Sequence, residues 1–466
     1  MVRKLLIVWF SLIPFANAKA QEEVYDVIII GGGLSGLTAA YYLETNNYLV
    51  LEKEEKVGGR VIGGQWKGFH YPKGTEYIGE PEGVLKEVIE ELGLEVVAVP
   101  PPTDGIAYQG QIYTRRQLLD FLPSRKQKRQ FRGLGRKLNR LARGTEDFIW
   151  EGDHLKKKYR ELDGTPVKKW LETNEVHPLI QHYIEVENLG LFSANNEELS
   201  ILYNASEMAY NLPSPRDYEE SEVFTFPRGM IELSDALENE IQGKIMYQAE
   251  VVKVVKEAEF IRVEAILGNK KINFKAKNIV CATPAPISGK ILEGSISEKA
   301  KQQLSSIRYG QYVTINIFTK KRFLNQAWTV TCLDNYFTSI YDVTRGQTSS
   351  DHKGESIISA YIPSYAATDS TFINQTDREV FKKTIQGMET YFPSITASVV
   401  DYDIQRFKYA YPVFGLGYSK VLEVLNTDES LQENIFLAGD YMTYAVVDGA
   451  ILSGYLAAQK VNAQKG

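Results

Sequence analysis

The sequence is poor in the residues that build metal centres, disulfide frameworks and membrane spans. Its 466 residues include only two cysteines and five histidines, and neither cysteine has a metal-ligand spacing. His177 and His182 are five positions apart, whereas two ligands on one helix face are four apart. We therefore expect no metal site. After the first twenty residues, no apolar run is long enough to span a bilayer.

Basic residues are not in excess. The chain has 53 Lys and Arg against 59 Asp and Glu, which gives a formal net charge of −6. This balance argues against bulk binding of nucleic acid, and no basic recognition module is present. Cys281 and Cys332 lie in the apolar runs 278–282 and 328–333, which favours two buried thiols, with a disulfide as the alternative.

Residues 1–20 have the order of a secretory signal peptide. Arg3 and Lys4 precede an apolar run, and small residues follow, so cleavage is predicted after Ala18 or Ala20. The alternative is a short membrane anchor, but about eleven apolar residues are too few to span a bilayer. We therefore expect a protein exported to the periplasm or secreted.

The segment after the leader predicts a nucleotide-binding βαβ unit. A β-branched run at 24–30 ends in glycines, a helical pattern covers 34–43, and a second strand is predicted at 48–51. Helical patterns dominate from 115 to about 211, strands return from 224, and a last strand and helix are expected at 435–438 and 447–461. The α/β parts at the start, middle and end predict an interrupted nucleotide domain.

The turn between the first strand and helix carries a phosphate-binding pattern. Gly31, Gly33 and Gly36 form G-x-G-x-x-G, in which glycines permit a tight turn and close approach of a pyrophosphate. The helix that starts at Leu34 and Ser35 presents free N–H groups to the phosphates. Glu52 closes the second strand, where a carboxylate can accept both ribose hydroxyls.

The next residues separate FAD from NAD. Lys53 follows the acid, and Gly58, Gly59 and Arg60 bring backbone and a guanidinium to the pyrophosphate. With these motifs, the chain resembles the superfamily of flavin amine oxidases, phytoene desaturases and protoporphyrinogen oxidases. The segment 71–79 resembles the family segment that passes near the flavin ring, and 436–441 with 448–454 resembles the carotenoid-desaturase form of the C-terminal motif.

The resemblance implies an enzyme that binds FAD non-covalently, since no cysteine lies near Tyr411 to form a covalent link. The implied fold class is α/β, with a discontinuous Rossmann-type FAD-binding domain (21–80, 224–290 and 400–466) and an interleaved α+β substrate domain (81–223 with a helical insertion, and 291–399). The resemblance adds these cofactor residues to those already named: Gly74, Thr75, Val251 at the adenine, Gly439, Asp440 and Val447.

The sequence departs from amine oxidases at two positions. Thr314 aligns with the family lysine that holds a water at flavin N5, and Val446 aligns with a member of the tyrosine cage. Without the lysine, a positive group that assists O₂ reduction is missing. We therefore expect a dehydrogenase or desaturase that passes a hydride from a small, apolar substrate to flavin N5, with O₂ or a quinone as the acceptor. The alternatives are an amine or amino-acid oxidase that makes peroxide, a flavin-dependent polyene isomerase, and a non-catalytic FAD-binding protein.

The region 115–143 is strongly basic and has apolar residues at helical spacing. Phe131, Leu134, Leu138 and Leu141 fall on one helix face. Such a helix can lie on an anionic membrane, or its apolar stripe can pack on the domain as an ordinary solvated helix. Both readings stay open at the level of sequence, and peripheral membrane contact is one expectation.

Overall fold

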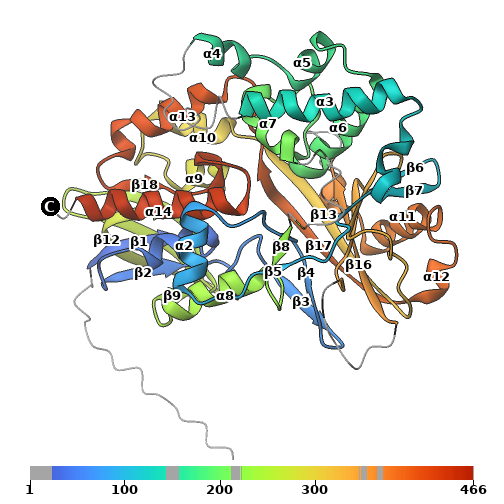
Figure 1. Ribbon diagram of the computed structural model, residues 1–466. Helices are drawn as coiled ribbons and strands as arrows, with labels where there is room; N and C mark the ends of the chain where they lie inside the picture. Colours follow the sequence, from blue (N-terminus) through green and yellow to red (C-terminus); the bar gives the residue numbers. More distant parts are fainter. Residues whose placement is uncertain are drawn as a thin grey trace, which may run out of the picture.

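The computed structural model describes residues 24–142, 157–210, 212, 221, 223–345, 347, 354–364 and 371–464. The predicted signal peptide lies outside the described residues. The described residues form two large sheets, and a group of helices lies at the top of the molecule in the view of Figure 1. Among the described residues, no helix is both long enough and apolar enough to cross a membrane.

The first sheet contains the βαβ unit. Strand β1 (Val24–Ile30) pairs in parallel with β2 (Tyr48–Leu51) and with β12 (Lys270–Cys281). The buried residues of β1, at 27–30, are all apolar, because helices cover both faces of a parallel sheet. The remaining strands are β9 (Ile245–Met246), β10 (Ala249–Lys256), β11 (Ile261–Leu267) and β18 (Ile435–Leu437).

Helices from both chain ends cover this sheet. Helix α1 (Leu34–Tyr41) packs against α14 (Val447–Ala463), and α2 (Gly83–Glu91) packs on α14 in turn (Figure 1). Helix α8 (Ile231–Glu240) lies on α1. Further helices beside this sheet are α9 (Ala285–Ile291), α10 (Glu298–Ser306) and α13 (Tyr418–Thr427).

The second sheet is mixed and largely antiparallel. Its strand order is β17-β13-β16-β15-β14-β6-β7, and only β14 and β6 pair in parallel among neighbours of the described sheet. Apolar residues of β13 and β16 pack under α11 (Asp377–Glu389) and α12 (Ile395–Ser398). The strands are β17 (Val399–Pro412), β13 (Tyr309–Thr319), β16 (Ser356–Pro363), β15 (Ser339–Asp342), β14 (Thr329–Cys332), β6 (Asp104–Tyr108) and β7 (Gln111–Thr114).

The predicted fold class is confirmed, with a parallel Rossmann-like sheet and a separate mixed sheet. Sheet membership differs from the expected domain boundaries at two places. Strand β17 was assigned to the FAD-binding domain, but it pairs along its length with β13 in the second sheet. Helix α2 was assigned to the substrate domain, but its buried Leu85, Val88 and Ile89 join the core of the first sheet.

The helices above the second sheet include the basic segment. A 3-10 helix, η1 (Arg115–Phe121), precedes α3 (Arg125–Ala142), which packs on α7 (Ile201–Tyr210). Phe131, Leu134 and Leu138 are buried in the core below and Leu141 is half-buried, whereas basic residues such as Arg129, Arg132 and Arg136 are exposed. The other helices and short strands are α4 (Lys157–Asp163), α5 (Val167–Thr173), α6 (Pro178–Phe192), β3 (Gly63–Trp66), β4 (Phe69–Pro72), β5 (Val97–Ala98) and β8 (Phe224–Thr225).

Both cysteines are free and buried in the structure, as the sequence favours.

Candidate active site

The turn between β1 and α1 leaves room for a phosphate. A Cβ on Gly36 would lie 1.9 Å from the carbonyl oxygen of Gly31, so only glycine allows this approach of helix to strand. Helix α1 begins with Leu34 and Ser35 buried, and no side chain caps its N-terminus. A Cβ on Gly33 would meet no atom within 4 Å. Free helix N–H groups beside open space fit a pyrophosphate.

Glu52 is oriented by backbone donors at the end of β2. Its carboxylate accepts hydrogen bonds from the N–H groups of Gly32 (2.6 Å) and Glu54 (2.8 Å), and the residue is 6% exposed. A carboxylate has about four acceptor sites, so two remain for ribose hydroxyls. Val251 lies close by, because Ala249 N–H donates to the Glu52 carbonyl at 2.8 Å. Lys53 turns outward and pairs with Glu54 in solvent.

Arg60 joins the N-terminal and C-terminal segments. Its Nη1 lies 2.6 Å from Asp440 Oδ2 and donates to the Ala410 carbonyl at 2.5 Å. The Asp440 side chain is 4% exposed and that of Arg60 is 35% exposed, so this ion pair is partly shielded from water. Gly58 N–H donates to the Gly32 carbonyl at 2.9 Å, which brings Gly58 and Gly59 alongside the glycine turn.

Helix α14 presents a second uncapped N-terminus. The helix starts at Val447, no side chain caps it, and Val446 occupies the N-cap position. A Cβ on Gly454 would lie 2.2 Å from the Ser35 carbonyl oxygen, so α1 and α14 cross in close contact. Gly439 N–H donates to Ser453 Oγ at 2.9 Å, which fixes the turn before Asp440 to this helix.

The segment 72–76 lies between the two sheets. Thr75 N–H donates to the Arg60 carbonyl at 3.2 Å, and a Cβ on Gly74 would lie 2.1 Å from the same oxygen. On the other side, Thr314 Oγ1 donates to the Lys73 carbonyl at 2.6 Å, and Thr314 is 2% exposed. Thr314 therefore anchors this segment to β13. Contacts therefore link several of the residues expected at the cofactor: Gly32 meets Glu52 and Gly58, and Arg60 meets Asp440 and the segment 72–76.

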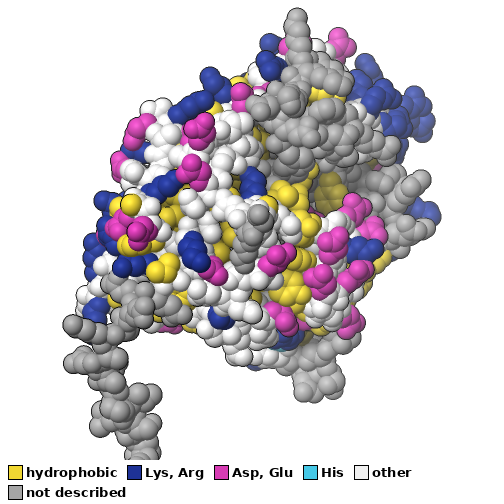
Figure 2. Space-filling model, turned by 90° about the vertical axis from the view of Figure 1, so that its left-hand side faces the viewer, with side chains coloured by type: hydrophobic (Ala, Val, Ile, Leu, Met, Phe, Trp, Pro, Cys, Tyr) yellow, Lys and Arg dark blue, Asp and Glu magenta, His cyan; other side chains and the backbone are white. Residues whose placement is uncertain are grey.

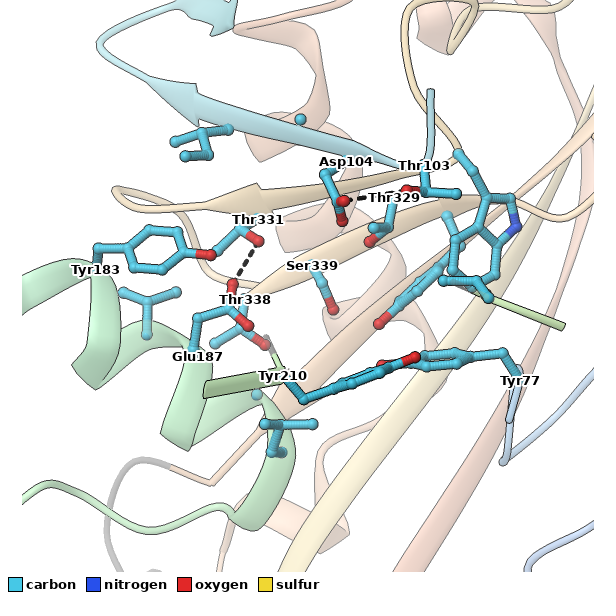
Figure 3. Close-up of a pocket in the computed structure, with 18 residues that line it drawn as sticks. Tyr77, Thr103, Asp104, Tyr183, Glu187, Tyr210, Thr329, Thr331, Thr338 and Ser339 are labelled. Carbon is cyan, nitrogen blue, oxygen red and sulfur yellow. Dashed lines mark hydrogen bonds between the residues drawn. The ribbon is translucent and has the colours of Figure 1, made fainter. Parts of the chain in front are cut away.

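A cavity lies beside this segment, between α6 and the second sheet (Figure 3). Figure 3 shows Tyr77 at one end and Tyr183 with Glu187 at the other. The ring centroids of Tyr77 and Trp328 are 5.3 Å apart, and those of Trp328 and Tyr341 are 5.1 Å apart. The cavity is therefore walled by aromatic rings near the 72–76 segment.

Two carboxyl groups line the cavity, whereas no Lys, Arg or His is among the described residues that do so. Glu187 Oε1 accepts from Thr331 Oγ1 at 2.5 Å, and Asp104 Oδ2 accepts from Thr103 Oγ1 at 3.0 Å. Burial raises the pKa of Glu187 to about 7, and the charge of Asp104 adds to the shift. Such a lining attracts cations and repels anions.

Three further carboxyl groups near the junction of the sheets have raised pKa values. Burial raises the pKa of Glu76 and Glu207 to about 8 and about 7, respectively. It raises that of Asp448, in the first turn of α14, to about 6. In Figure 2, apolar side chains gather in a hollow near the middle of the molecule, with acidic side chains along one side.

Sequence reasoning missed these carboxyl groups. Glu187 belongs to a predicted helical region with many charged residues, and no local motif distinguishes it from the solvent-facing glutamates. Glu76 lies within the segment 71–79, between β4 and α2, where an acid followed by Tyr77 and Ile78 was the available signal.

Comparisons with known proteins place the chain in a family. The model of the flavin containing amine oxidoreductases matches residues 34–462. An L-amino acid dehydrogenase of Synechocystis sp. is 24% identical over 318 residues, which cover 63% of each chain. A probable flavin-containing monoamine oxidase A of Dictyostelium discoideum is 23% identical over 291 residues, which cover 58% of this chain and 60% of the relative.

Solved structures share the fold. Putrescine oxidase bound to putrescine has a TM-score of 0.77 at 18% identity, with 95% of this chain and 99% of that chain covered. A fatty acid isomerase of P. acnes that produces CLA has a TM-score of 0.70 at 16% identity, with 93% and 98% covered. From the family match over 34–462, this chain is an enzyme that belongs to the flavin containing amine oxidoreductase family, whose cofactor is FAD.

Proposed function

We propose that this protein is an FAD-dependent dehydrogenase that oxidises an amine carrying a second cationic group. The observation that carries the proposal is the cavity, in which the carboxyl group of Glu187 lies among aromatic rings and Asp104 adds a second carboxyl group to the lining. A cation stabilises the ionised form of a carboxyl group that is removed from water, and a cationic substrate would do so at Glu187. The substrate previously expected was apolar, and these carboxyl groups favour a cation instead.

The residues around the turn and the chain ends would hold FAD. The N-terminus of α1 would hold the pyrophosphate, Glu52 the adenosine ribose, and Val251 the adenine. Arg60 and Asp440 join the N-terminal and C-terminal segments, and the uncapped N-terminus of α14 would stabilise negative charge at the flavin. When bound, FAD supplies the acceptor for a hydride. The attachment would be non-covalent, because no cysteine lies near Tyr411 in the sequence, where a covalent link would be expected, and both Cys281 and Cys332 are buried.

The cavity would orient the substrate along its length. Tyr77 lies at the end near the segment 72–76, and Glu187 lies at the opposite end (Figure 3). Tyr341 also lines the cavity and contacts Trp328, which contacts Tyr77. A cation received by Glu187 directs the other end of the molecule toward the segment that we expect beside the flavin ring. Aromatic faces between the two ends favour a cationic or apolar chain.

The environment of Thr314 supports a dehydrogenase over an oxidase. The hydroxyl of Thr314 donates to the Lys73 carbonyl. The ammonium of Lys73 lies 2.7 Å from the Asp403 carboxylate, so it does not take the place of the family lysine. A positive group that would assist O₂ reduction is therefore missing from that place. The electron acceptor would be a quinone or another small oxidant.

Turnover with alternative acceptors tests this proposal. Purified holoprotein is given an α,ω-diamine or a monoamine of the same length, with either O₂ or a soluble quinone as the acceptor. We expect faster turnover of the diamine, and faster turnover with the quinone than with O₂. Rapid, stoichiometric peroxide formation in air would identify an oxidase instead.

A second candidate is a flavin-dependent reaction on an unsaturated apolar chain, either desaturation or isomerisation. The aromatic lining of the cavity favours it, and the fold is shared with a fatty acid isomerase. A polyene converted without any acceptor would identify an isomerase, whereas conversion that requires an acceptor would identify a desaturase.

A further inference from the structure

Strands β13 and β16 present a row of polar side chains to the segment 72–76. In their antiparallel pairing, Thr314 lies opposite Tyr361, and Asn316 lies opposite Ser359. Directly opposed residues point to the same face of a sheet. This face meets the segment, because Asn316 Nδ2 donates to the Pro72 carbonyl at 2.9 Å.

The hydroxyl hydrogens of this row are already used. The donation from Asn316 Nδ2 to a carbonyl fixes the amide orientation, so its Oδ1 is an acceptor and Ser359 Oγ must donate to it. Tyr361 OH donates to the Gly74 carbonyl, which can only accept. A hydroxyl has one hydrogen, so both groups offer only oxygen lone pairs in other directions.

The carboxyl group of Glu76 faces these two hydroxyls. Its Oε1 is buried and has no hydrogen-bond partner. An ionised carboxylate would place its own lone pairs against those of Ser359 and Tyr361, with no donor to compensate. A protonated carboxyl group can donate its hydrogen to either oxygen. Burial is the largest effect and raises the pKa of Glu76 to about 8. Donation from Ser359 or Tyr361 would lower this pKa, but the hydrogens of both hydroxyls are used by Asn316 and Gly74, so the neutral acid is favoured.

We infer that Glu76 is kept protonated and is the proton-holding group beside the flavin ring, in the place where Thr314 leaves the family lysine missing. The inference rests on the FAD site of the proposed function, but not on the identity of the substrate. Thr314 links the missing lysine to Glu76. Its hydroxyl donates to the Lys73 carbonyl, and Tyr361, which lies opposite Thr314 on the next strand, faces Glu76.

The groups that titrate around Glu76 are tyrosines. Tyr341, Tyr361 and Tyr411 all have pKa values above the ordinary value, chiefly because of burial, and each is affected by the charge of Glu76. They are neutral when Glu76 ionises. Lys73 is paired with Asp403 at 2.7 Å, so its ammonium is directed to another carboxylate. Ionisation of Glu76 therefore adds an uncompensated negative charge beside the ring.

The consequence is a pH-dependent flavin potential. Below about pH 8 the neutral acid does not oppose the negative charge that the flavin gains on reduction. As the pH rises through that value, the carboxylate makes reduction harder, so the midpoint potential falls more steeply with pH. In Glu76→Gln the side chain keeps its size and cannot ionise, and the additional fall disappears.

Two measurements on the holoprotein test the inference without any substrate. Electrochemical titration gives the flavin midpoint potential against pH, and infrared difference spectra of wild type minus Glu76→Gln give the band of a protonated carboxyl group. In the wild type, we expect the plot of midpoint potential against pH to become steeper near pH 8, and the infrared band of the protonated carboxyl group to disappear as the pH rises through the same value. The exposed Glu80, four residues along the chain, provides the control, and Glu80→Gln should behave as wild type.

A carboxyl group already ionised at pH 6, or identical potential curves for wild type and Glu76→Gln, would overturn the inference. If Glu76→Gln does not fold, the wild-type infrared titration decides by its midpoint: a protonated carboxyl band that is lost near pH 8 supports the inference, and the absence of such a band contradicts it. Failure of the protein to oxidise amines would leave these results unaffected, whereas failure to retain FAD would refute the proposed function on which the inference rests.

Discussion

Substitution of Glu187 by Gln should remove the preference for a dicationic substrate. Glu187 is the carboxyl group at the end of the cavity opposite Tyr77, and Thr331 already provides one of its hydrogen bonds. A charge-assisted hydrogen bond contributes about 1.5–3 kcal/mol. Its loss corresponds to about 10- to 150-fold in kcat/KM for a diamine, because each 1.4 kcal/mol is about tenfold. A monoamine of the same length should change little.

The pH dependence gives the same prediction independently. The pKa of Glu187 is raised to about 7, so the carboxylate that attracts the cation is present above that pH and lost below it. In wild type, kcat/KM for the diamine should fall about tenfold per pH unit below about pH 7, and Glu187→Gln should lose this dependence. Steady-state kinetics from pH 5.5 to about 8.5 with a quinone acceptor provide the assay. The exposed Glu172 on α5 supplies the control Glu172→Gln. An unchanged ratio of diamine to monoamine in Glu187→Gln would refute the reasoning.

Three further predictions concern the cofactor clamp and the surface. Asp440→Asn leaves a partly buried guanidinium without its charge partner, so unfolding should require about 2 kcal/mol less and FAD should dissociate more readily, as measured by thermal unfolding and flavin fluorescence. Gly36→Ala places a methyl group 1.9 Å from a carbonyl oxygen, so the purified protein should contain little flavin by absorbance, and full flavin content would contradict the packing. Arg129, Arg132 and Arg136 on α3 are exposed while its apolar stripe is buried, so any binding to anionic vesicles should weaken with salt and disappear in the triple Gln variant, as sedimentation would show. Binding that resists salt would mean that apolar residues insert.

The nucleotide turn could be predicted because its signals are local. The glycines at 31–36 and the acid at 52 occur within one βαβ unit, so spacing along the chain reflects spacing in the fold. Strand β17 was not predicted as a strand of the second sheet. Its residues are mostly half-buried and strongly polar, which suits a strand at the sheet edge and gives little apolar alternation.

The acidic features of the site could not be predicted because they depend on contacts between distant segments. Glu76 meets Ser359 and Tyr361 only after β16 has paired with β13. Glu187 becomes a cavity residue only because β14 brings Thr331 beneath α6. Neither acid has a neighbour along the chain that reveals its environment. Thr314 was located by resemblance, but its bond to the Lys73 carbonyl required the structure.

Anaerobic reduction of the bound flavin tests the central claim most directly. Purified holoprotein is titrated with an α,ω-diamine in the absence of any acceptor, and the visible absorbance of the flavin is followed. The account predicts complete bleaching by one equivalent of diamine, and weaker reduction by the monoamine of equal length. No bleaching by any amine, with bleaching by an apolar polyene, would contradict it.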